Sequence, residues 1–254
     1  MNKIWQIGLN TLKESMRKKT LYIILIFALI VIGASKLFSF LTAEEELKMI
    51  KDVSFSAIEF FGALIAIFAS LTAVSTEIER RTIDTLLTKP IRRSDFIIGK
   101  FVGVSLIVLI NFVLTSLFFI GLLLVKKSVP DIEVFKTLIL IFFELLLIGG
   151  ITLALATFTT DAFNIICSVF LYIVGHLTSY GKEMVERTEN IIVAGLADMI
   201  YTLVPNYENF NIRDKVVVGI NVSWGYVGYT ILYGILYLGI ALLIALYFFE
   251  KREI

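Results

Sequence analysis

Residues 77–100 read EIERRTIDTLLTKPIRRSDFIIGK and carry six basic and four acidic residues. The chain as a whole is 58% hydrophobic, and this charged stretch lies between two apolar segments long enough to cross a bilayer. Residues 77–87 have helical spacing, because Ile83 meets Leu86 and Leu87 at i+3 and i+4. The pattern predicts a short amphipathic helix held between two membrane-spanning helices.

Pro90 ends that helix, because a proline pushes the preceding residue, Lys89, out of helical backbone angles. Ser94 is then placed to cap a second helix that leads into the membrane. A charged loop between spans is often only a solvated segment that fixes topology. The other interpretation is a rigid helix that makes mechanical contact with a cytosolic partner. Charge alone favours the solvated segment.

Besides its charge, this stretch has an order of residues that resembles a known pattern. Glu-x-Glu-x-x-Thr, Leu-Leu, Pro-Ile-x-Arg and Gly-Lys-Phe follow one another here, as they do between the second and third spans of type-2 ABC export permeases, which this stretch resembles. Many members have glycine where this chain has Arg81, so the local turn is expected to differ. In that family the segment is the coupling helix that docks on the ATP-hydrolysing subunit. The resemblance implies this contact for Glu77, Glu79, Arg80, Thr82, Ile83, Leu86, Leu87, Pro90, Arg93, Gly99 and Lys100.

Composition limits the class of protein. Mean hydropathy is +0.89, which indicates one integral membrane domain over residues 1–254. The formal net charge of +1 gives no electrostatic argument for nucleic acid as a partner. One cysteine, Cys167, and one histidine cannot build a His/Cys metal site within the chain, so we expect no metal ion.

The N-terminal residues 3–19 predict a basic amphipathic helix lying in the membrane interface. Its apolar side is Trp5, Leu9, Leu12 and Met16. Type-2 permeases have an elbow helix at this place, which here corresponds to residues 1–20. A signal peptide is rejected, because a long patterned stretch precedes the apolar run and no small-x-small cleavage site follows it.

The fold class expected is an all-α integral membrane protein with six transmembrane helices. The predicted spans are residues 21–41, 55–76, 101–125, 137–158, 164–180 and 226–249. An acidic external loop is expected at residues 44–52, and a tight turn at 159–163. A stripe of small residues in the second span, Gly62, Ala66, Ala69 and Ala73, favours close packing within the chain over a dimer seam. Basic residues near helix ends place both termini and residues 77–100 in the cytosol.

Residues 181–225 form the predicted external connection between the fifth and sixth spans. Residues 182–204 have a helical apolar stripe but too many charges to span, so they are expected to lie on the outer leaflet or to cap the bundle. Pro205 ends this helix and a polar run follows. The sequence Pro-Asn-Tyr-Glu-Asn-Phe-Asn at 205–211 is similar to the branch that includes the copper-processing permeases of nitrous oxide reductase maturation.

Catalytic motifs are missing from the sequence. No Gly-x-x-x-x-Gly-Lys-[Ser/Thr] phosphate loop occurs, so this chain is not expected to hydrolyse ATP, and ATP and Mg²⁺ are expected on a partner ATPase subunit. An intramembrane metalloprotease would need further His or Asp ligands beside His176, which the sequence does not offer. A nucleophile motif is also missing. The chain is therefore interpreted as a non-enzyme.

Polar residues inside the spans are the candidates for a substrate cavity, because burying them is costly. They are Glu144, Asn111, Asn164 and His176, and Glu59 lies near the outer end of the second span. Glu144 either lines a cavity that opens outward, is satisfied by a neighbouring helix, or is kept neutral by desolvation. For the asparagines and the histidine, satisfaction by a neighbour is the favoured reading.

These expectations combine into a permease subunit of a type-2 ABC exporter in a prokaryotic plasma (inner) membrane. The resemblance implies two cytosolic ABC ATPase subunits and a second permease copy or a paralogue as partners, in contact with membrane lipid. A membrane scaffold that recruits a cytosolic protein without transport is the alternative from another class. A secondary transporter is a third, although the inverted repeats expected of it are not evident. The sequence does not identify the substrate.

Overall fold

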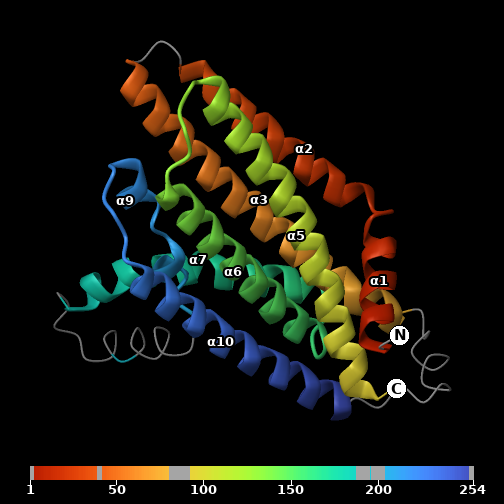
Figure 1. Ribbon diagram of the computed structural model, residues 1–254. Helices are drawn as coiled ribbons and strands as arrows, with labels where there is room; N and C mark the ends of the chain where they lie inside the picture. Colours follow the sequence, from red (N-terminus) through yellow and green to blue (C-terminus); the bar gives the residue numbers. More distant parts are fainter. Residues whose placement is uncertain (1–2, 39–41, 80–91, 187–194, 196–203, 252–254) are drawn as a thin grey trace.

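The computed structural model describes residues 3–38, 42–79, 92–186, 195 and 204–251 (Figure 1). Within this part of the chain the structure is helical and contains no strand, which confirms the all-α class. The long helices are α1 Lys3–Ser15, α2 Lys19–Ala34, α3 Ala43–Glu79, α5 Arg93–Val125, α6 Ile132–Ala156, α7 Asp161–Glu186 and α10 Trp224–Lys251. Short helices follow at η1 Ser35–Phe38, η2 Tyr207–Phe210 and α9 Arg213–Val217.

Five of the described helices, α3, α5, α6, α7 and α10, are long and apolar enough to cross a membrane. Large apolar side chains remain exposed on them, for example Leu117 on α5 and Leu243 on α10, as expected of surfaces that face lipid. The first predicted span, residues 21–41, is not among these five, because its helix is shorter than expected. Its helix, α2, ends at Ala34 after 16 residues and continues as the 3-10 helix η1.

The helices pack around α3, which contacts α2, α5, α6 and α7 (Figure 1). α10 lies along α6, and α1 packs against the first half of α5. The labels N and C lie near each other in Figure 1. The start of α5 also contacts the end of α10, because Arg93 hydrogen-bonds to the last carbonyls of that helix. Both termini therefore lie at the same end of the bundle.

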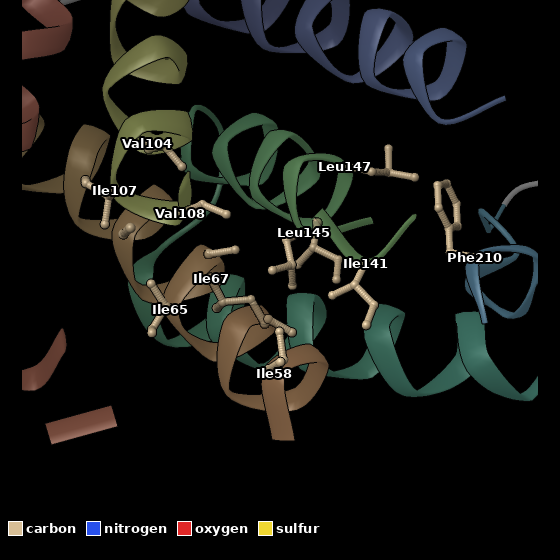
Figure 2. Close-up of a cluster of buried hydrophobic side chains, with 14 of the residues drawn as sticks. Ile58, Ile65, Ile67, Val104, Ile107, Val108, Ile141, Leu145, Leu147 and Phe210 are labelled. Carbon is tan, nitrogen blue, oxygen red and sulfur yellow. The ribbon is translucent and has the colours of Figure 1, made fainter. Parts of the chain in front are cut away.

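The small-residue stripe on α3 packs within the chain, as the sequence favoured. A Cβ atom on Gly62 would lie 2.6 Å from Cδ1 of Leu145 on α6, so a larger residue there would require the Leu145 side chain to shift. Ala66 and Ala69 are fully buried. The apolar core continues from this seam across α5 and α6 and reaches Phe210, whose ring lies beside Leu147 (Figure 2).

The most deeply buried positions of α1, where it packs on α5, are small residues and not its apolar stripe. Gly8, Thr11 and Ser15 are its buried positions, while Trp5 and Met16 are exposed. Gly99 and Gly103 of α5 give α1 room. The predicted N-terminal helix is confirmed over residues 3–15, and Trp5 and Met16 of its apolar stripe are left for contact with lipid, whereas Leu12 packs against the core.

The prediction of an acidic loop at residues 44–52 is wrong, because α3 begins at Ala43 and these residues form its first turns. Thr42 and Glu45 form a reciprocal capping box: the Thr42 hydroxyl accepts from the Glu45 backbone N–H (3.4 Å), and the Glu45 carboxylate accepts from the Thr42 backbone N–H (3.4 Å) and hydroxyl (2.8 Å). Ion pairs of Glu46 with Lys126 and of Lys51 with Asp131 then tie this end of α3 to the connection between α5 and α6.

Three further boundaries differ from the sequence prediction. Ser94 does not cap α5, because the N-cap position is Arg92, two residues earlier, and the helix begins at Arg93. The predicted turn at 159–163 ends sooner, since α7 begins at Asp161. α7 also continues to Glu186 and so includes the first residues of the expected external connection. The helix predicted over 182–204 otherwise lies almost wholly outside the described residues.

Candidate functional site

Three ionisable side chains from three helices converge inside the bundle. Nε2 of His176 on α7 lies 2.7 Å from Oε1 of Glu59 on α3 and 3.3 Å from Oε1 of Glu144 on α6. One ligand atom from each of the three residues lies within 4.8 Å of the others. All three belong to the membrane-spanning parts of their helices, where unpaired charge is expensive and therefore informative. We call these three residues the carboxylate–histidine cluster.

The other ring nitrogen of His176 is held by the backbone. Nδ1 lies 3.0 Å from the carbonyl oxygen of Tyr172, one turn earlier on α7. The Tyr172 ring also packs edge-on against the imidazole, with 4.6 Å between the ring centroids. These contacts fix the orientation of the imidazole, so Nε2 is directed toward the two carboxylates.

Arg213 of α9 reaches the cluster from outside the spans. Its Nη1 donates to the Ser56 hydroxyl (2.9 Å) and lies 3.4 Å from Oε2 of Glu59. The guanidinium therefore pairs with the Glu59 oxygen that does not face His176. This arrangement offsets one carboxylate charge and leaves Oε1 of Glu59 directed to the imidazole.

Residues 205–213 pack over the carboxylate–histidine cluster, and we call these residues the roof segment. Tyr207 is buried against Gly175, where a Cβ atom would lie 2.2 Å from the Tyr207 ring. The roof segment is also tied to α10, because the hydroxyl of Tyr233 accepts from the Asn206 N–H (2.8 Å). The hydroxyl of Tyr226 in turn donates to the carbonyl of Asn209 (2.8 Å). The polar run expected to lie outside the bundle is thus folded into it.

Local hydrogen bonds explain why this polar run can be packed inside. The Asn206 side chain accepts from the Glu208 N–H (3.0 Å), and the Asn211 side chain accepts from the Arg213 N–H (3.3 Å). Both are Asx turns, which satisfy backbone donors in a segment without regular helix. Burial raises the pKa of the Tyr207 hydroxyl, which therefore stays neutral.

Glu208 is the remaining charged group near the cluster. Burial raises the pKa of its carboxyl group, while the hydrogen bond from Asn211 and the charges of His176 and Arg213 act in the opposite direction. The charge of Glu59 adds to the effect of burial. Glu208 therefore shares the electrostatic environment of the carboxylate–histidine cluster, although it lies outside the spanning helices.

The structure brings together only two of the four intramembrane candidates. Glu144 and His176 are neighbours in the cluster. Asn164 is fully buried elsewhere on α7, where its Nδ2 donates to Thr152 of α6 (3.2 Å) and its Oδ1 accepts from Ser168 (2.9 Å). Asn111 of α5 donates to the carbonyl of Ile107 (2.8 Å) and faces a small gap beside α1 and α2.

The residues expected to contact an ATPase are only partly described. Glu77 and Glu79 belong to the last turn of α3, but their side chains lie outside the described part of the structure. The same holds for the whole of residues 80–91, which include Arg80, Thr82, Ile83, Leu86, Leu87 and Pro90. Lys100 is buried on α5 with its Nζ 5.4 Å from the centroid of the Phe96 ring. A Cβ on Gly99 would lie 2.7 Å from Cβ of Ile7, and Arg93 caps the end of α10.

A family comparison decides the class of the chain. Residues 6–254 match the ABC-2 family transporter protein model, which covers nearly the whole sequence. The chain belongs to the ABC-2 transporter family. No curated protein matches it with significance. As an ABC-2 family member with several spanning helices, it is a multi-pass membrane component of a transporter and not itself a catalyst.

Sequence reasoning about this ABC-2 permease missed part of the cluster. It noted Glu59 only by its place in the second span, and it did not include Arg213 or Tyr207 among the candidates. The signal that could have found the roof segment is the asparagine spacing, since Asn206 and Asn211 each precede a residue whose N–H they accept. Nothing in the sequence relates Arg213 to Glu59, because only helix packing brings them together.

Proposed function

We propose that this chain is the permease subunit of an ABC-2 exporter in a prokaryotic plasma membrane, driven by ATP that a separate cytosolic subunit hydrolyses with Mg²⁺. The observation that carries the proposal is the family match over residues 6–254. The charged stretch at 77–100 supports it, because this is where a coupling helix would join the second and third spans. Both termini would then be cytosolic.

The first turns of α5 are packed so that a displacement of the preceding segment would be transmitted to the neighbouring helices. Gly99 and Gly103 hold α1 at backbone distance, so α1 cannot slide without moving α5. Arg93 and Phe96 hold the end of α10, the second by stacking on Phe249 with 5.2 Å between ring centroids. A displacement at residues 80–91 would therefore reach α1 and α10 through α5.

Within the proposed coupling segment, Ile83, Leu86 and Leu87 would provide the apolar contact with the ATPase. Glu77, Glu79 and Arg80 would make polar contacts around it. Arg93 was expected in this group, but its guanidinium donates to α10, so its part in coupling is to hold two helices together. A second permease copy or a paralogue would complete the transporter.

The experiment compares two apolar-to-acid variants, one in the segment that precedes α5 and one in the connection that follows it. Leu86→Glu changes the proposed coupling helix, and Val129→Glu changes an exposed residue in the connection between α5 and α6. Each is expressed in its native host with an affinity tag and purified from membranes. We expect an ATP-binding subunit to co-purify with the wild type and Val129→Glu, with ATPase activity stimulated by the permease, and both to be lost with Leu86→Glu.

The two variants must first be shown to insert equally, by their yield in the membrane fraction. Loss of the ATPase from both variants alike would contradict a specific coupling role for residues 77–100. Retention of the partner by Leu86→Glu would do the same. Association that does not depend on nucleotide, with no stimulated hydrolysis, would support the membrane scaffold instead.

A further inference from the structure

We infer that Glu59, Glu144 and His176 form an intramembrane binding site for a divalent transition-metal ion, with Zn²⁺ as the best chemical fit. The inference rests on the geometry of the carboxylate–histidine cluster and does not depend on the proposed transport function. The ligand atoms would be Oε1 of Glu59, Oε1 of Glu144 and Nε2 of His176, which come from α3, α6 and α7.

The first step is the tautomer of His176. The Tyr172 carbonyl oxygen can only accept a hydrogen bond, so Nδ1, 3.0 Å away, carries a proton. In the neutral imidazole Nε2 then has a lone pair and no hydrogen. A ring N–H held by a backbone carbonyl is also the usual outer support of a metal-bound histidine, because it sets the tautomer and the ring orientation.

The second step is what Nε2 faces. Two carboxylate oxygens lie 2.7 and 3.3 Å from it, so three atoms that can each coordinate a cation converge. Among the described residues, Nε2 of His176 and Oε1 of Glu144 are buried without a hydrogen bond of acceptable geometry. Such atoms require a cation or a proton, and poor alignment for a hydrogen bond favours an ion that lies between the three atoms.

The third step is size and ligand type. Ligand atoms about 2.0 Å from a tetrahedral Zn²⁺ lie about 3.3 Å from one another. The separation of Nε2 from the Glu144 oxygen already equals this value, and the 2.7 Å separation from the Glu59 oxygen needs to widen by only about 0.6 Å. One imidazole with two carboxylates suits Zn²⁺ better than Ca²⁺ or Mg²⁺, which prefer oxygen alone, or Cu⁺, which prefers sulfur.

The fourth step is charge and access. With the carboxylates of Glu59, Glu144 and Glu208 ionised beside the guanidinium of Arg213, the group would carry two negative charges. A divalent cation would balance both of these charges. The side chains of His176 and Arg213 are 17% and 27% exposed, so this is the side of the cluster nearest to the surface.

The test uses the purified full-length chain in detergent, carrying an affinity tag without histidine and stripped with a chelator. Zn²⁺ binding is measured by equilibrium dialysis with elemental analysis. We expect about one Zn²⁺ per chain, and affinity weakened roughly tenfold or more in His176→Gln and in Glu144→Gln, since even outer-shell losses cost that much. Glu45→Gln removes an exposed carboxylate from the same helix as Glu59 and is expected to bind as the wild type does.

A second measurement keeps the inference testable if a variant fails to fold. His176 is the only histidine in the chain, so imidazole coordination seen by X-ray absorption at the zinc edge of the wild-type protein identifies the site. We expect one imidazole and oxygen ligands. Absence of bound Zn²⁺, a coordination shell of oxygen alone, or equal binding by all variants would overturn the inference and leave a shared proton as the cluster's occupant. None of these results bears on ATPase association.

Discussion

The guanidinium of Arg93 donates to the carbonyl oxygen of Glu250 over 2.8 Å, and also to that of Phe249 over 3.0 Å. The last carbonyls of a helix have no partner within it, so a cation placed there satisfies them and matches the helix dipole. α5 thus begins where α10 ends. Arg93, which the family resemblance placed at an ATPase contact, therefore makes these hydrogen bonds within the chain.

Arg93→Gln is expected to lower the free energy of unfolding by about 2 kcal/mol, because it removes charge-assisted hydrogen bonds to both carbonyls. Arg93→Lys should recover part of the loss, since a lysine keeps the charge but not the planar fork. Thermal unfolding in detergent measures both. Arg92→Gln removes an exposed neighbouring charge and is the control. Equal melting temperatures for Arg92→Gln and Arg93→Gln would show that the bond to α10 contributes nothing.

Gly103→Ala is expected to detach α1 from α5. A Cβ atom at this position would lie 2.5 Å from Cβ of Thr11 and 2.8 Å from the backbone oxygen of Gly8. Because a backbone atom cannot move aside cheaply, we expect a loss of stability of about 1–3 kcal/mol. Limited proteolysis should also cut the N-terminal helix sooner, which a melting curve alone would not reveal.

The control is Gly121→Ala on the same helix, where an added Cβ meets nothing within 4 Å. Alanine favours helix over glycine by about 1 kcal/mol, so this variant should be neutral or slightly more stable. If Gly103→Ala behaves like Gly121→Ala, the close approach of α1 and α5 is not needed for packing.

The spanning helices were predictable because hydropathy and length decide them locally. The predictions that were wrong depend on interactions between segments, which the sequence of one segment does not reveal. Residues 44–52 look like a loop by charge, but a capping box at Thr42 and an ion pair between Glu46 and Lys126, 80 positions later, make them helix. The roof segment looks external by polarity, yet Tyr207 and Phe210 are buried in it.

The candidate site was predictable only in part for the same reason. Glu144 and His176 could each be selected as costly residues inside a span. Their proximity to Glu59 depends on the relative orientation of α3, α6 and α7. Small residues such as Gly62 allow these helices to pack closely, but the sequence does not specify how they are oriented. Arg213 enters from a short helix that the sequence placed outside the bundle.

Glu208→Gln is expected to stabilise the chain at neutral pH. Burial raises the pKa of Glu208 above its ordinary 4.5, so the folded protein favours the protonated carboxyl group. The stability from this preference is present below about pH 4.5 and is lost as the pH rises through the folded pKa. Gln imitates the protonated form and can still accept from Asn211.

The measurement is the melting temperature of both proteins with a chelator present, from pH 4 to pH 8. The two should melt together at the acid end, and the variant should melt higher as the pH rises. A variant that is less stable at pH 8 would mean that the ionised carboxylate is favoured by Arg213 and His176 more than burial opposes it.

The last prediction concerns which end of the bundle is cytosolic. Basic residues near helix ends favour the end that holds both termini. In a Cys167→Ser background, single cysteines are placed at Lys3 on α1 and at Val129 in the connection between α5 and α6, both of them exposed. A maleimide that cannot cross membranes should label Val129→Cys in intact cells and Lys3→Cys only after the membrane is opened. The reverse pattern would place residues 77–100 outside the cell, where no ATPase could reach them, and would contradict the proposed function directly.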